Sequence, residues 1–250
     1  MNLILLSDND FTGHNLAVLR DERRVKHILG VHRADVGDTL KVGLVNDKVG
    51  EGTITAIKDC SVTLSVALTS PPPIPSNVRL ILALPRPPML KRILQTISTL
   101  GIKELVLLQS SRVDKSYWQT PQLNELKIRE ELILGLEQAR DTVLPQISFA
   151  KRFRPFVEDS LIDFVGTEQG FVAHPYARQS SPHNIEAPCV IAIGPEGGFL
   201  DKEVDEFSRR GFTGISLGER ILRVETAVTY LLGRFSNNVT NSSMATAGLK

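Results

Sequence analysis

The order of apolar segments after residue 77 is the feature that most restricts the fold of this chain. Short apolar runs, typical of buried strands, alternate with longer segments whose apolar residues recur every three or four positions, as in helices. This alternation is typical of a parallel sheet with helices on both faces, so we expect an α/β domain. Its strands are expected at 78–84, 105–108, near 147, near 172, at 190–193 and at 214–217, and its helices at about 87–100, 122–140, 201–210 and 224–235.

The first 70 residues show a different pattern. Short β-prone runs at 39–45, 52–57 and 61–68 are separated by glycine and aspartate. The last two runs alternate polar and apolar residues, as half-buried strands do. One helical stretch, at about 22–29, interrupts them. Short strands at this spacing indicate a small β-barrel.

A proline-rich segment separates the two patterns. Four prolines fall between Ser70 and Ser76, and such a segment continues neither a strand nor a helix. We therefore place a linker at 71–76, between a barrel domain at 1–70 and an α/β domain at 77–236. The last residues, 237–250, are polar and low in complexity, and we expect a disordered tail there.

Composition restricts the class of protein. The 250 residues are 42% hydrophobic and 23% charged, which suits a globular protein with a buried core, and the net charge of +1 means that any RNA site must come from local clusters. Cys60 and Cys189 are far apart in sequence, so we expect reduced thiols, without a disulfide or a zinc site. We find no signal peptide and no apolar stretch near the ~20 residues that span a bilayer, and we expect a cytoplasmic protein.

Two glycine-containing turns follow expected strands near the C-terminus. The first comprises 194–199 (GPEGGF), and the second comprises 217–227 (LGERILRVETA). Glycine allows a ligand to approach the backbone, and ligands of open α/β sheets bind at the carboxyl ends of the strands. Neither turn has a P-loop or dinucleotide fingerprint. The alternatives are an ordinary strand-to-helix turn for the first, and packing of Ile221 and Leu222 on the core for the second.

These two turns closely resemble those of the RsmE family, the 16S ribosomal-RNA uridine methyltransferases of the SPOUT class, which act at N3 of uracil. The resemblance extends to Ala173-His174-Pro175, to the segment 84–112 and to the segment from His27 to Asp38. It therefore covers nearly the full chain.

The resemblance implies an N-terminal PUA-like β-barrel, a C-terminal SPOUT α/β domain with a trefoil knot, and a homodimer. It also implies S-adenosyl-L-methionine as the cofactor, 16S ribosomal RNA or the small ribosomal subunit as the partner, and neither a metal nor a membrane. The loops after three strands would hold the cofactor. The cofactor-binding candidates are His174, Pro175, Gly194, Pro195, Glu196, Gly197, Gly198, Leu217, Gly218, Ile221 and Leu222.

Two charged residues beside the second turn are the catalytic candidates. Uracil N3 carries a weakly acidic proton, so its methylation is helped by a base or by a charge that stabilises the uracil anion. Glu225, expected in the first turn of a helix, is the candidate for handling that proton or orienting the ligand. Arg223 is the candidate for stabilising negative charge or binding a phosphate. The alternative is a surface Arg–Glu pair at the start of a helix.

Basic residues cluster in two stretches that flank the proline-rich segment. The stretch from Cys60 to Lys103 has five basic residues and no acidic one, and a second cluster around residues 20–33 is diluted by Asp21 and Glu22. Such clusters suit a track for RNA phosphates, and solvated faces are the alternative. The RNA-binding candidates are Arg20, Arg24, Lys26, Arg33, Arg86, Lys91, Arg92 and Arg112.

The chain departs from the family pattern at two places. The family usually has Glu-Gln-Ser/Cys-Gly-Arg where this chain has Glu137-Gln138-Ala139-Arg140-Asp141, so the arginine is displaced by one position. On a helix this displacement turns a side chain by about 100°. His32 stands where the family commonly has leucine. Two other functions stay open: a methyltransferase of another RNA, such as transfer RNA, and a non-catalytic RNA-binding or ribosome-assembly factor.

Overall fold

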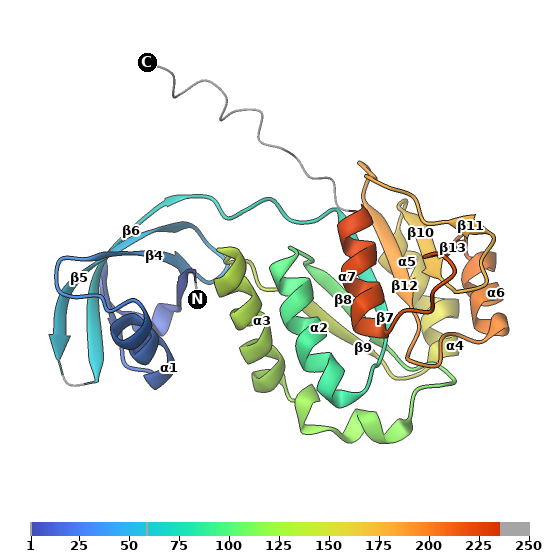
Figure 1. Cartoon of the computed structure of the whole chain (residues 1–250), viewed down its shortest axis with the longest axis horizontal. Helices are drawn as coiled ribbons and strands as arrows, with labels where there is room; N and C mark the ends of the chain where they lie inside the picture. Colours follow the sequence, from blue (N-terminus) through green and yellow to red (C-terminus); the bar gives the residue numbers. More distant parts are fainter. Residues whose placement is uncertain (1, 59, 236–250) are drawn as a thin grey trace, which may run out of the picture.

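The computed structural model describes residues 2–58 and 60–235, which form two sheets at opposite ends of an elongated molecule (Figure 1). The N-terminal sheet has the strand order β1-β4-β5-β6-β3-β2. All its neighbouring strands are antiparallel except β1 and β4. Its strands are β1 (Ile4–Leu6), β2 (Phe11–Gly13), β3 (Leu16–Leu19), β4 (Thr39–Leu44), β5 (Val49–Lys58) and β6 (Ser61–Ser70).

This curled sheet encloses a core of its own. Alternate residues of β5 and β6, such as Ile54 and Leu64, are buried in it, so the prediction of half-buried strands is confirmed. The predicted helical stretch is also present: α1 (Glu22–Lys26) continues into a π-helical turn (His27–Val31). α1 begins where it does because the Asp21 side chain accepts a hydrogen bond from the backbone N–H of Arg24.

The second sheet has the order β11-β13-β10-β12-β7-β8-β9, and its paired strands are all parallel. The predicted parallel α/β sheet is therefore confirmed. Its strands are β7 (Val78–Ala83), β8 (Glu104–Leu108), β9 (Gln146–Ala150), β10 (Gln169–Ala173), β11 (Gln179–Ser180), β12 (Cys189–Ile193) and β13 (Thr213–Ser216).

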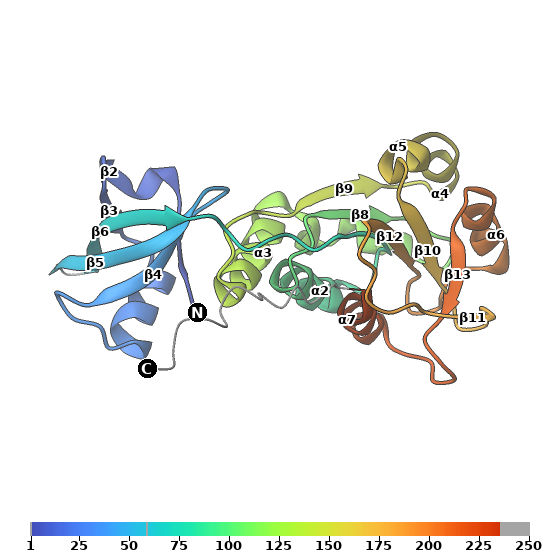
Figure 2. The same cartoon turned by 90° about the horizontal axis from the view of Figure 1, so that it is seen from above.

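Helices cover both faces of this sheet (Figure 2). One face carries α2, α3 and α7, and α4 and α5 lie on the opposite face. The helices are α2 (Pro87–Thr99), α3 (Glu125–Ala139), α4 (Phe153–Pro155), α5 (Leu161–Val165), α6 (Asp201–Arg209) and α7 (Val224–Phe235), with 3-10 turns at Lys115–Gln119 and Pro121–Leu123 and a π-helical turn at Phe156–Ser160.

Local sequence signals explain the helix ends. Pro87 and Pro88 occupy the first turn of α2, where a missing N–H costs nothing. Gly101, just past that helix, has a φ of +77°, a conformation that glycine adopts freely. α3 begins later than predicted, because the Asn124 side chain caps it and accepts a hydrogen bond from Leu126 N–H. The segment 153–165 and the short strand β11 were not predicted.

The structure corrects the expectation for Arg140. The prediction that a one-residue displacement turns this side chain by about 100° assumed that Arg140 lies on a helix. α3 ends at Ala139, and Arg140 follows it in the left-handed conformation, with φ 59° and ψ 37°. The helical rotation therefore does not apply, and the prediction is wrong. In L-residues other than asparagine and aspartate this conformation is uncommon.

The proline-rich segment runs from the end of β6 to the start of β7 and contains no helix or strand. The domain limits at 70 and 77, and the knot, stay predictions, and the expected tail at 237–250 lies outside the described residues.

Both cysteines are free: Cys60 is exposed, whereas Cys189 is buried in β12. Burial, aided by the nearby charge of Glu168, raises the pKa of Cys189 to about 12.

The strand order sets the place of a site. β10 lies between β12 and β13, and in the parallel register Ala173 pairs with both Ile193 and Ile215. The three strands therefore end at the same edge of the sheet. The loops that follow them are consequently neighbours in space, although they are separated by up to about forty residues in the chain.

Candidate active site

A cavity of about 260 Å³ lies where the loops after β10, β12 and β13 meet. Every cofactor-binding candidate predicted from the sequence lines it: His174, Pro175, Gly194, Pro195, Glu196, Gly197, Gly198, Leu217, Gly218, Ile221 and Leu222. The structure thus brings together segments that the sequence keeps apart. The prediction did not include the other lining residues Ala173, Tyr176, Ile193, Phe199, Arg220, Val224 and Ala227, and it placed Arg112, which also lines the cavity, with the RNA-binding residues.

The glycine-rich loop after β12 folds back on itself. A Cβ atom on Gly194 would lie 2.7 Å from the backbone nitrogen of Phe199, so only glycine fits there. Gly198 has a φ of +71° and donates its N–H to Pro195 O at 2.7 Å. Phe199, which is buried, anchors the end of the loop in the core. The loop therefore presents main-chain atoms, with few side chains, to the cavity.

The loop after β13 forms the opposite wall. Gly218 has a φ of +106°, and its N–H donates to Ser216 Oγ at 3.2 Å. Ile221 is 75% exposed, so the alternative that it packs on the core is wrong, while Leu222 is half-buried. α7 begins directly afterwards, and Val224 and Ala227 on its first turn complete the wall.

Polar contacts fix the glycine-rich loop to the ends of β7 and β8. The Glu196 side chain accepts the backbone N–H of Arg86 at 2.9 Å, and the Arg112 guanidinium donates to Gly197 O. The Glu203 carboxylate, 2% exposed, accepts the backbone N–H groups of Ser111 and Leu200, both at 2.8 Å. Buried carboxylates need such partners, and through them Glu203 ties the end of this loop to the segment that follows β8.

His174 and Tyr176 form the third wall. The backbone N–H of His174 donates to Ile215 O at 2.9 Å, which ties this loop to β13. The His174 ring contacts the Tyr176 ring edge to face, with centroids 5.7 Å apart, and its Nε2 lies 3.9 Å from Asp201 Oδ1. Tyr176 is 81% exposed at the rim. No sequence signal singled it out, because an isolated tyrosine two residues after a strand is common.

The catalytic candidates Glu225 and Arg223 lie beside the cavity and do not line it. They flank Val224, which does. Arg223 is exposed and Glu225 is half-buried in the first turn of α7. In the described part of the chain no ion pair joins them, so the alternative of a surface Arg–Glu pair is not what the structure shows.

The RNA-binding candidates do not form one cluster. Arg20, Lys26 and Arg33 are exposed on the N-terminal half, whereas Arg86, Lys91 and Arg92 are exposed at the start of α2 and Arg112 lies at the cavity. Lys26 pairs with Glu22 at 2.5 Å, and Lys91 pairs with Glu131 at 3.1 Å.

Arg24 requires a correction. Its guanidinium is largely buried and is bound by Asp10, by Asp21 and by Leu5 O. It therefore stabilises the N-terminal half, and its guanidinium is not an exposed cation like those of the other candidates.

Within residues 2–58 and 60–235, no cluster of three His, Cys, Asp or Glu side chains could hold a metal ion. No helix of the same residues is both long and apolar enough to cross a membrane.

Residues 72–236 match the family model described as an RNA methyltransferase domain. The chain is 30% identical to ribosomal RNA small subunit methyltransferase E of Treponema pallidum (strain Nichols), over 91% of this chain and 87% of that protein. It is 23% identical to methyltransferase E 1 of Borreliella burgdorferi (strain B31), over 91% and 94% of the two chains. Its fold matches the crystal structure of the Neisseria gonorrhoeae methyltransferase E bound to S-adenosyl methionine, with a TM-score of 0.73 and 20% identity over 93% and 95% of the chains. The chain therefore belongs to the ribosomal RNA small subunit methyltransferase E family of RNA methyltransferases.

Proposed function

We propose that this RNA methyltransferase uses S-adenosyl-L-methionine to methylate N3 of a uridine in 16S ribosomal RNA. The observation that carries the proposal is the single cavity built by the loops after β10, β12 and β13. It gathers every residue for which the family resemblance implies cofactor contact.

The cavity suits S-adenosyl-L-methionine on physical grounds. Most of its lining residues are glycine or apolar residues, which is typical of small-molecule sites. Gly198 and Gly218 have no other atom within 4 Å of the position of a Cβ, so a ligand can approach the backbone of two walls closely. Arg112 and Arg220 supply positive charge for the carboxylate of the methionyl part. S-adenosyl-L-methionine, when bound, supplies a methyl group on a positively charged sulfur.

The residues around the cavity would prepare the acceptor. Leu222, Val224 and Ile221 supply apolar surface beside the position where uracil N3 must be placed, and placement accounts for much of the rate of such a reaction. Glu225, beside this wall, takes the N3 proton. Arg223 stabilises the negative charge that remains on the base or holds a neighbouring phosphate. Both act from outside the cofactor cavity, where the RNA would bind, because neither residue lines that cavity.

Binding of RNA through exposed cations predicts strong salt dependence. The affinity for 16S ribosomal RNA should fall steeply between 50 and 200 mM salt, by about 10³-fold if about six phosphates are contacted. Arg33→Ala and Arg92→Ala should each flatten the slope of log affinity against log salt by about one charge. Arg24→Ala should instead destabilise the fold, because its partners Asp10 and Asp21 would lose their cation. A flat salt profile for the unaltered protein would show that Arg33 and Arg92 do not contact RNA phosphates.

We also infer a cytoplasmic homodimer. Ile221, in the loop before α7, and Tyr230, on α7, are exposed large apolar side chains, and a second copy of the chain would cover them. Light scattering after gel filtration tests this: twice the chain mass is expected, and a single chain mass at micromolar concentration would contradict it.

Two measurements separate the proposal from its alternatives. Calorimetry should show S-adenosyl-L-methionine binding at one site per chain, whereas a non-catalytic assembly factor of the same fold need not bind it. Mass spectrometry of RNA from cells that lack the protein should show loss of one N3-methylated uridine from 16S ribosomal RNA. Loss of a methylated nucleotide from transfer RNA would support the other-RNA alternative.

A further inference from the structure

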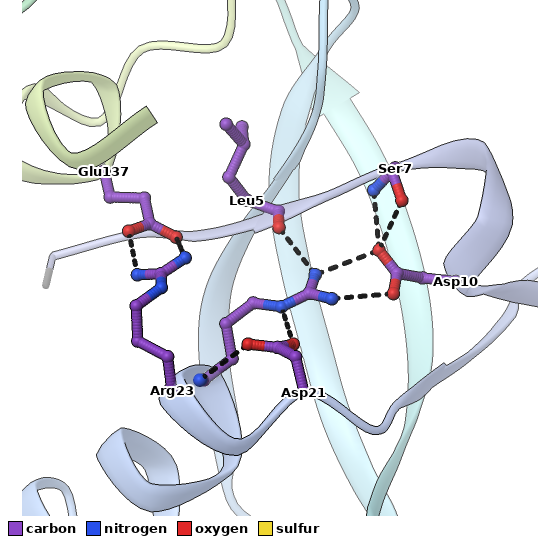
Figure 3. A network of polar contacts seen from close by, with 7 residues as sticks. Leu5, Ser7, Asp10, Asp21, Arg23 and Glu137 are labelled. Atoms are coloured by element: carbon purple, nitrogen blue, oxygen red, sulfur yellow. Dashed lines mark hydrogen bonds and ion pairs between the residues drawn. The ribbon is translucent and has the colours of Figure 1, made fainter. Parts of the chain in front are cut away.

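The C-terminal end of α3 contacts the N-terminal half of the molecule (Figure 3). Glu137, on the last turn of α3, accepts two hydrogen bonds from Arg23 of α1: Nη1 lies 2.5 Å from Oε2, and Nη2 lies 3.0 Å from Oε1. The Glu137 side chain is 1% exposed and that of Arg23 is 47% exposed. A charged side chain this deeply buried is rarely found without a partner, so the two halves meet at a defined ion pair.

The surrounding contacts are also specific. Asn2 donates its backbone N–H to Glu137 O at 3.1 Å and its side-chain amide to Gln138 O at 2.9 Å. Beyond the helix, Thr142 O accepts the N–H of Asn46 at 2.8 Å. Leu136 packs beneath them in a small apolar cluster shared by both halves. These contacts leave one favoured arrangement of the N-terminal sheet against α3.

α1 is itself held firmly. Arg24, the neighbour of Arg23, binds both carboxylate oxygens of Asp10 at 2.8 and 2.9 Å and also binds Leu5 O at 2.8 Å. Burial acts to raise the pKa of Asp10, but the hydrogen bonds from Arg24 and Ser7 and the charge of Arg24 together hold that pKa below its ordinary value. Asp10 thus stays charged at neutral pH and fixes Arg24. Arg23 is thereby presented to α3 in a fixed position.

We propose that Glu137 and Arg23 are a positioning pair: they set the orientation of the N-terminal sheet relative to the cofactor cavity, so that RNA held by the sheet reaches the cavity. This inference rests on the proposed function, because it assumes that RNA contacts both halves. The pair acts at a distance from the chemistry. α3 lies beside the N-terminal sheet, whereas the cavity loops lie at the far end of the parallel sheet (Figures 1 and 2).

The test is the kinetics of Glu137→Gln and Arg23→Gln with 16S ribosomal RNA as the substrate. Each change removes one charge and retains the shape of the interface. We expect the RNA KM to rise about tenfold, equivalent to ~1.4 kcal/mol, with kcat and cofactor affinity altered by less than about twofold. The double variant should be little worse than either single one, because the two changes remove the same contact. Arg23→Lys should recover part of the loss.

The matched control is Glu130→Gln, on the same helix. Glu130 is exposed and pairs only locally with Lys127, at 2.7 Å, so its removal should leave the RNA KM unchanged. A merely structural role for Glu137 would lower thermal stability and leave the RNA KM unchanged, which would overturn the proposal.

Small-angle X-ray scattering tests the positioning pair separately from the proposed function. The measurement needs no methyl transfer, so it reports on the orientation of the two halves even if the substrate is an RNA other than 16S ribosomal RNA. Glu137→Gln should change the scattering curve, because the contacts that remain, those of Asn2, Asn46 and Leu136, no longer fix one orientation by themselves. An unchanged scattering curve together with an unchanged KM contradicts the positioning pair. Absence of cofactor binding by the unaltered protein would instead contradict the proposed function.

Discussion

Replacing Gly194 with alanine should weaken S-adenosyl-L-methionine binding by about 100-fold, or ~2.7 kcal/mol. The added Cβ would lie 2.7 Å from the backbone nitrogen of Phe199 and 2.9 Å from the carbonyl carbon of Gly198. These are backbone atoms of the same loop, so no flexible side chain can move aside. The loop must change its path, and its main-chain groups would no longer face the cavity. Calorimetric titration of the variant measures the effect.

The control for this variant is Gly13→Ala in β2, where an added Cβ meets nothing within 4 Å. That variant should bind the cofactor like the unaltered protein. Circular dichroism should show that Gly194→Ala keeps its helix and strand content, since the loop lies at the edge of the sheet. Normal cofactor affinity in a folded Gly194→Ala protein would mean that this loop does not form the cofactor site.

Replacing Glu225 with glutamine should lower kcat by about 10²- to 10⁴-fold, the usual range for loss of a general base. The amide keeps the size of the side chain but cannot accept the N3 proton. Cofactor affinity should be retained, because Glu225 does not line the cavity. Single-turnover methyl transfer to 16S ribosomal RNA is the appropriate measurement, since it isolates the chemical step from product release.

Glu219 offers a matched control on the loop that leads into α7. It is exposed and lies outside the cavity wall, so Glu219→Gln should leave kcat unchanged. If Glu225→Gln also turned over normally, Glu225 would have no part in proton transfer. The proton would then leave to another group or to water, and the roles given to Arg223 and Glu225 would need to be reassigned.

The parallel sheet could be predicted because its strands are buried on both faces and therefore consist of continuous apolar runs, such as 190–193. The helices could be predicted from periodicity and from Pro87, Pro88 and Gly101. β1, β2 and β3 were missed because strands of three or four residues carry too little pattern. The segment 153–165 was missed because its helical pieces are short and a π-helical turn interrupts their periodicity.

The cavity lies after three strand ends, where ligands of open α/β sheets bind, but its individual residues were predicted from the family resemblance, and their contact with the cofactor stays a prediction. The roles of individual charged residues could not be predicted from the sequence. Arg24 lies in a basic cluster in the sequence, yet its partner Asp10 is fourteen residues away and comes from a different element. Glu137 and Arg23 are separated by 114 residues, so only the tertiary structure shows that they meet. Arg140 was misplaced because the helix ends one residue earlier than predicted.

The most direct test of the central claim is methyl transfer from isotopically labelled S-adenosyl-L-methionine to small ribosomal subunits that lack the modification, followed by mass spectrometry of the RNA. The account predicts one labelled N3-methyluridine in 16S ribosomal RNA, and a loss of that label with Gly194→Ala. Label at a carbon or a ribose oxygen, label only in another RNA, or no label in protein that binds the cofactor would contradict it.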